Sequence, residues 1–104
     1  MTVPYTQIDV VIDQGGAGTT ELIAAVAGRT IRILNFSIVM SATGTFAWSD
    51  GTDWKSGDYP ILGNGGIAES GSRDDPLFIC AAGRPLSITT TGGSAHGRVR
   101  AEYR

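Results

Sequence analysis

Three aspartates within nine residues, Asp50, Asp53 and Asp58, carry the carboxylate oxygens that calcium prefers as ligands. Their segment reads DGTDWKSGD, which lacks the regular alternating spacing and the terminal glutamate of a calcium loop. Aspartate also favours turns, because its side chain hydrogen-bonds to nearby backbone N–H groups. We therefore predict that these aspartates form turns and that the chain binds no metal.

The other side chains that could do chemistry do not form a catalytic set. His96 is the single histidine and lies in a glycine-rich stretch, where we expect a turn facing solvent, whereas a metal site needs three or four ligands. Cys80, the single cysteine, follows an apolar run and is expected to pack as a small hydrophobic residue. Glu69 and Asp74 could act as a carboxylate pair on a glycan, but nothing distinguishes them from the other acids. The sequence predicts a non-enzymatic protein without a cofactor.

Two tryptophans and a tyrosine lie on or beside a predicted hairpin. Trp48 shares strand parity with Phe46 and is expected in the core. Trp54 is flanked by charged residues and is the better candidate for exposure. Exposed aromatic rings stack on sugars or anchor protein partners. Trp54 and Tyr59 are therefore candidate contacts for a glycan or a partner, with packing in the core as the alternative.

Composition indicates one small all-β domain over residues 1–104, with residues 1–6 as an N-terminal arm. The chain has 104 residues, of which 41% are hydrophobic, and 15 glycines, about twice the average usage. The glycines separate short apolar runs, which is typical of an antiparallel β-sandwich or barrel. The expected strands are residues 5–12, 19–27, 29–40, 45–49, 52–55, 59–62, 67–70, 76–80, 85–91 and 97–103.

Charge and hydropathy argue against nucleic-acid and membrane partners. The net charge is −2 and no basic block is present, so a surface that follows phosphates is not expected. Arg98 and Arg100 share a face of the last strand with Glu102 and Arg104, which we interpret as a solvated face. No signal peptide and no membrane-spanning run is visible, so we expect a soluble protein made in a cytoplasm.

The segment 29–40 contains apolar residues at both strand parities. One face is expected to carry Ile31, Ile33 and Val39, and the other Leu34, Phe36, Ile38 and Met40. A half-solvated strand would alternate instead, so this strand is predicted to be central or to meet another subunit. We predict a homo-oligomer whose interface includes Ile31, Ile33, Val39 and Phe78, since burying one extra Ile or Phe contributes roughly 1.5–3 kcal/mol.

The order of motifs along the chain adds a resemblance. The strings are AAVAGRTIRILNFSIVMS, the WSDGT hairpin, PILGNGGI and PLFICAAGRPLSITTTGGSAHGRVRAEY. Over about residues 20–104 this order resembles the small jelly-roll structural proteins of tailed bacteriophages. The chain departs from that pattern at Asn64, at Glu69 and at Trp54–Lys55, which lengthen or alter loops.

This resemblance implies a jelly roll of about eight strands and a place in the virion, after assembly in the host cytoplasm. It also implies a homotrimer that decorates the capsid and contacts the major capsid protein or another virion protein. The alternative is a fibre module, or a receptor- or carbohydrate-binding module, of the phage tail or head.

Overall fold

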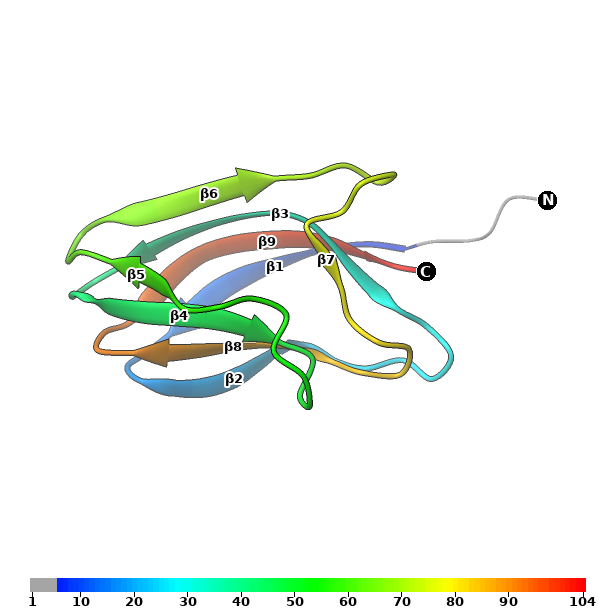
Figure 1. Cartoon of the computed structure of the whole chain (residues 1–104), viewed down its shortest axis with the longest axis horizontal. Coiled ribbons are helices and arrows are strands. Elements are labelled where there is room, and N and C mark those ends of the chain that lie inside the picture. The colour runs from blue at the N-terminus through cyan, green and yellow to red at the C-terminus, as the bar shows by residue number, and fades with distance from the viewer. Residues whose placement is uncertain (1–5) are drawn as a thin grey trace.

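The computed structural model describes residues 6–104, so the expected arm at residues 1–6 lies outside the described residues apart from Thr6. Nine strands and no helix make up this part of the chain (Figure 1). Their bounds are β1 Thr6–Gln14, β2 Gly18–Ile23, β3 Ile31–Met40, β4 Gly44–Ser49, β5 Tyr59–Ile61, β6 Gly66–Ser70, β7 Phe78–Ile79, β8 Leu86–Thr91 and β9 Ala95–Tyr103.

The strands form two antiparallel sheets that face each other as a sandwich (Figure 1). The five-stranded sheet has the order β1-β9-β3-β6, with the two-residue β7 also paired to β3, and the four-stranded sheet has the order β2-β8-β4-β5. The pairs β1–β9, β2–β8, β3–β6 and β4–β5 are nested, as in one long hairpin with its tip at β4–β5. Rolling that hairpin adds the β3–β9 and β4–β8 pairs. This arrangement is a jelly roll, which confirms the predicted fold class.

Aromatic rings fill the space between the sheets. Phe36 of β3 meets Trp48 of β4 edge to face, with 5.2 Å between ring centroids, and Phe46 lies 5.9 Å from Phe36. Trp48 and Phe46 are both 0% exposed, so the prediction that Trp48 belongs to the core is confirmed. Edge-to-face pairs add about 0.5–1.5 kcal/mol each to the burial of the rings.

A β-bulge in β3 changes which residues face the core. Ile33 pairs with Ala101 of β9 and Asn35 pairs with the next residue, Arg100, so Leu34 is an extra residue without a partner on β9. The bulge reverses the alternation of side chains beyond it. Residues 31, 33, 36, 38 and 40 therefore all point inward and are at most 2% exposed.

This bulge corrects two sequence-based expectations. The strand does not carry two apolar faces, because the residues assigned to opposite faces share one. Ile31 and Ile33 are each 0% exposed inside the sandwich, so their side chains cannot contact another subunit. Phe78 is half-buried with its ring 5.9 Å from that of Trp48, and the outward residue of β7 is its neighbour Ile79. Val39 remains 48% exposed.

Candidate functional site

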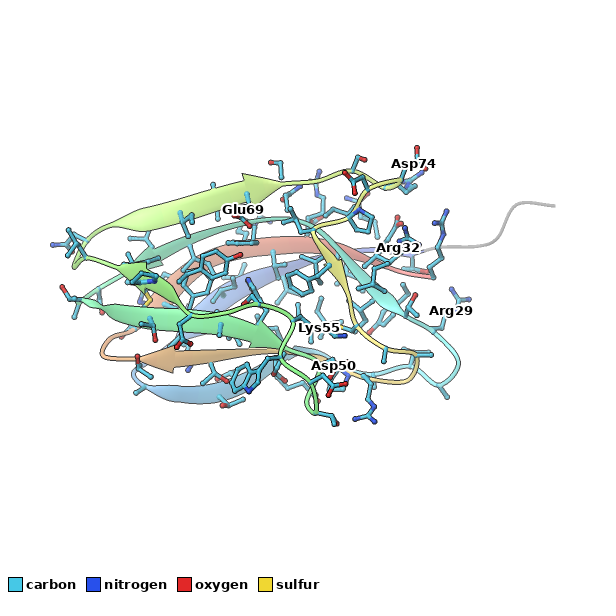
Figure 2. All side chains as sticks on the ribbon, viewed as in Figure 1. Arg29, Arg32, Asp50, Lys55, Glu69 and Asp74 are labelled. Carbon is cyan, nitrogen blue, oxygen red and sulfur yellow. The ribbon has the colours of Figure 1, made fainter. Side chains whose placement is uncertain are left out.

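Asp50, at the end of β4, organises the loop that follows. Its carboxylate is 0% exposed and accepts backbone hydrogen bonds from Asp53 (2.8 Å), Thr52 (3.2 Å) and Ala81 (3.3 Å). Figure 2 shows Lys55 beside it, with its ammonium 3.6 Å from the carboxylate. Burial by itself raises the pKa of Asp50, but these hydrogen bonds and the charge of Lys55 outweigh burial and leave the pKa below its ordinary value.

The aspartate segment therefore forms the turn that its composition predicts. The oxygens of Asp50 are used inside the protein, where they tie residues 50–53 to the loop after β7. Within residues 6–104, no group of three or more His, Cys, Asp or Glu side chains is close enough together to hold a metal ion.

Residues 54–56 are held against the end of β4, beyond the residues that pair with β5. The N–H of Lys55 donates to the carbonyl of Trp48 (2.8 Å), and the N–H of Trp48 donates to the hydroxyl of Ser56 (2.9 Å). Ser49 and Trp54 form an isolated antiparallel bridge, in place of the second strand predicted over 52–55. The backbone that carries Trp54 is therefore fixed to the sheet on both sides of the indole.

Trp54 is 63% exposed and borders a shallow hollow of about 460 Å³. We call this feature the Trp54 hollow. Its lining residues are Ala47, Trp54, Ser56, Gly57 and Asp58.

Tyr59 does not join Trp54 at this surface. Its ring stacks on Phe46, with 4.7 Å between centroids and 12° between planes, and its hydroxyl donates to Glu69 (3.2 Å). Burial, together with the charge of Glu69 and the hydrogen bond to it, raises the pKa of Tyr59. Tyr59 thus serves the sandwich, by linking β5 to β6 across the two sheets.

Glu69 and Asp74 do not form a carboxylate pair around a shared space. Glu69 is engaged with Tyr59, and Asp74 lies in the exposed loop after β6 (Figure 2).

Cys80 and His96, the remaining candidate nucleophile and base, do not form a catalytic arrangement either, because one is buried and the other faces solvent. Cys80 is 0% exposed, and burial together with the nearby Asp50 charge raises its pKa to about 11, so the thiol packs as a small hydrophobic group. His96 lies within β9 rather than in the expected turn. It does face solvent, and its Nδ1 is 3.1 Å from a carboxylate oxygen of Asp13.

The outer face of the five-stranded sheet combines ion pairs with exposed apolar side chains. Arg100 donates to Asp9 across β9 and β1 (3.0 Å). Val11 is 65% exposed and lies opposite Arg98, while Val39 on β3 lies opposite His96. Hereafter, "the outer face" means this surface of β1, β9 and β3.

A buried acid at one end of the outer face was not predicted. Glu102 is 0% exposed, with one carboxylate oxygen 3.2 Å from Nε of Arg73 and the other 3.9 Å from Nε of Arg32. Arg32 also donates to the carbonyl of Arg73 (3.2 Å), which ties the loop after β6 to β3 and β9. The expectation of a uniformly solvated face is therefore wrong at Glu102. Only the pairing of β3 with β9, which no local pattern reveals, brings Arg32 opposite this acid.

Comparison with known proteins gives the fold. No protein-family model and no curated protein sequence matches the chain. The coat protein of Tobacco streak virus is similar in structure, with a TM-score of 0.51 and 11% identity over 99% of this chain and 89% of that one. A protein of the disulfide-linked pili of Bacillus endospore appendages has a TM-score of 0.50 and 11% identity, over 95% of this chain and 85% of that one. A chain of the cyanophage Pam1 capsid has a TM-score of 0.47 and 9% identity, over 99% and 91% of the two chains.

At these identities, the viral coat protein and the pilus protein establish a shared β-sandwich fold and nothing further about activity. Among the described residues 6–104, no helix is long and apolar enough to cross a membrane.

Proposed function

We propose that this chain is a non-enzymatic structural subunit of a bacteriophage virion, and that it decorates the capsid as a homotrimer in contact with the major capsid protein. The motif order over residues 20–104 supports a phage structural protein. The jelly-roll fold, which it shares with a viral coat protein, is compatible with that role.

The observation that carries the assembly is the pair of exposed valines on the outer face. Val11 and Val39 are 65% and 48% exposed, although their strand neighbours Ile12 and Ile38 are at most 1% exposed. The interior is thus already filled, and these valines contribute nothing to it. Covering exposed apolar groups with another molecule is favourable by about 25 cal/mol per Å² of apolar area buried.

The surroundings of the valines also suit a contact between copies. The ion pairs Asp9–Arg100 and Asp13–His96 flank Val11 along β1 and β9. Exposed apolar side chains interspersed with polar and charged ones are a common composition of protein interfaces. Arg98, exposed beside Val11, supplies a cation that a carboxylate of another subunit can reach.

The oligomeric state tests this proposal. We expect the purified protein to sediment as a trimer at micromolar concentration. Val11→Asp and Val39→Asp are expected to shift it toward monomer with unchanged circular dichroism. Leu62→Asp is the matched control, because Leu62 is 77% exposed but lies after β5, away from the outer face. A wild-type monomer, or equal dissociation by all three variants, would contradict assembly at this face.

Location in the virion needs a separate experiment. Purified protein is added to capsids that lack it, and bound copies are located by cryo-electron microscopy. A decoration protein adds back at regular lattice positions. Binding to tails instead of capsids would favour the second candidate, a fibre module, for which the exposed Trp54 supplies a contact residue.

A further inference from the structure

We propose that the Trp54 hollow binds one neutral pyranose ring of a glycan, with the Trp54 indole stacked on the sugar and the Asp58 carboxylate accepting hydrogen bonds from its hydroxyls. The hollow opens beside β4 of the four-stranded sheet, whereas the proposed subunit contact lies on the five-stranded sheet. The inference therefore does not rest on the proposed function.

The first support is an exposed indole on a rigid base. An indole that is 63% exposed leaves in water most of an apolar surface that folding normally buries. Its backbone is nonetheless fixed, since Lys55 and Ser56 both hydrogen-bond to Trp48 and Asp50 holds the preceding turn. A ligand that stacks on this ring does not have to order the loop first, which preserves affinity.

The second support is the polar group within the same hollow. Asp58 is exposed, and among residues 6–104 its carboxylate makes no hydrogen bond or salt bridge. The hydroxyl of Ser56, by contrast, already donates to the carbonyl of Gly57. The hollow therefore offers one flat apolar wall and one acceptor that is available to a ligand.

A saccharide fits this combination better than other ligands do. The C–H face of a pyranose covers an aromatic ring while its hydroxyls reach a neighbouring carboxylate. A quaternary ammonium ion is usually enclosed by several rings, and here Trp54 is the single aromatic residue among those that line the hollow. An anionic sugar would be repelled by Asp58. The volume, about 460 Å³, lies within the range of small-molecule sites and far below a protein interface.

Screening on an array of neutral oligosaccharides tests the proposal. We expect a bound glycan whose affinity falls at least about tenfold in Trp54→Ala, falls less in Trp54→Phe and falls in Asp58→Asn. Leu62→Ala removes another exposed apolar residue and is expected to leave binding unchanged. No bound glycan on the array, or binding that Trp54→Ala leaves intact, would overturn the inference.

Tryptophan fluorescence gives a second readout with an internal reference. Trp54 is exposed and Trp48 is 0% exposed, so acrylamide is expected to quench chiefly Trp54. The array-selected sugar should protect Trp54 from quenching, and Trp54→Phe should remove the protected component. If the sugar leaves the acrylamide quenching of Trp54 unchanged, the hollow is not a saccharide site. Protection of Trp54 by a protein partner, with no protection by any sugar, would also contradict the proposal.

Discussion

Ile33 and Phe36 both point into the sandwich, although they are three positions apart on one strand. An uninterrupted strand would send them to opposite faces. The extra residue Leu34, at the shift in register with β9, brings them to the same side. Through this bulge, β3 supplies apolar groups to the interior along its whole length, and the outer face receives Val39.

Because of the bulge, truncating Ile33 and truncating Val39 should lower the free energy of unfolding by very different amounts. Ile33→Ala should lower the free energy of unfolding by about 2–5 kcal/mol, because it leaves a cavity in a packed interior. Val39→Ala should lower it by less than about 1 kcal/mol, because the valine is already 48% exposed. Urea denaturation of both variants at one protein concentration measures the difference. Similar losses would mean that Ile33 is not a core residue.

Gly97 is predicted to tolerate no side chain. Its φ is +152°, and a Cβ there would collide with the backbone carbonyl of Ser37 on β3. Gly97→Ala should therefore cost about 3 kcal/mol or prevent folding. Gly57→Ala is the matched control, since nothing lies within 4 Å of a Cβ at that position. Thermal unfolding of the two variants compares them, and an unchanged melting temperature for Gly97→Ala would exclude the close approach of β9 to β3.

Glu102 is predicted to stabilise the end of the outer face through its two arginines. Glu102→Gln removes a fully buried charge beside Arg32, which is itself largely buried. Loss of one member of such a cluster is expected to cost about 3 kcal/mol. Asp9→Asn breaks an exposed ion pair with Arg100 and should lose a small fraction of that stability. Chemical denaturation measures the free energy of unfolding of both variants. Equal losses would show that the burial of Glu102 does not strengthen its contribution to stability.

The lowered pKa of Asp50 predicts that the folded protein loses stability in acid. Its pKa in the folded protein lies below the ordinary value of 3.8, so the unfolded chain takes up the proton more readily. The contribution of Asp50 is present above about pH 4 and is lost as pH falls through the folded pKa. Asp50→Asn should lower the melting temperature at pH 6 and flatten its decline between pH 5 and pH 2.5. A variant whose profile stays parallel to that of the wild type would assign the acid sensitivity to other carboxylates.

Local patterns were sufficient for much of the fold. Trp48 follows the parity of Phe46 and is buried, whereas Trp54 is flanked by charges and is exposed, as the sequence predicts. Glycine-punctuated apolar runs located most strands to within a few residues. These features depend on neighbours along the chain, which a sequence displays directly.

The predictions that were wrong concern contacts between segments that lie far apart in the sequence. The bulge at Leu34 follows from the register of β3 with β9, which lies about 65 residues further along the chain. No residue type in β3 indicates it. The partners of Glu102 come from β3 and from the loop after β6. Tyr59 does not reach the candidate glycan surface, because its side chain packs on Phe46 and hydrogen-bonds to Glu69, which lie on two different sheets. Such contacts depend on how the sheets are assembled rather than on composition.

The nested order of strands constrains how the chain is made. β9 lies between β1 and β3, and β8 lies between β2 and β4, so the two last strands are interior members of the sheets. During synthesis, β1 and β2 leave the ribosome long before the strands that pair with them. The backbone N–H and C=O groups along β1 and β2 stay unpaired until β9 and β8, respectively, have been added, and a chain that stops before β8 has neither sheet complete. We therefore expect ribosome-bound nascent chains of this protein to leave this domain unfolded, and open to chaperones and proteases, until β9 has emerged.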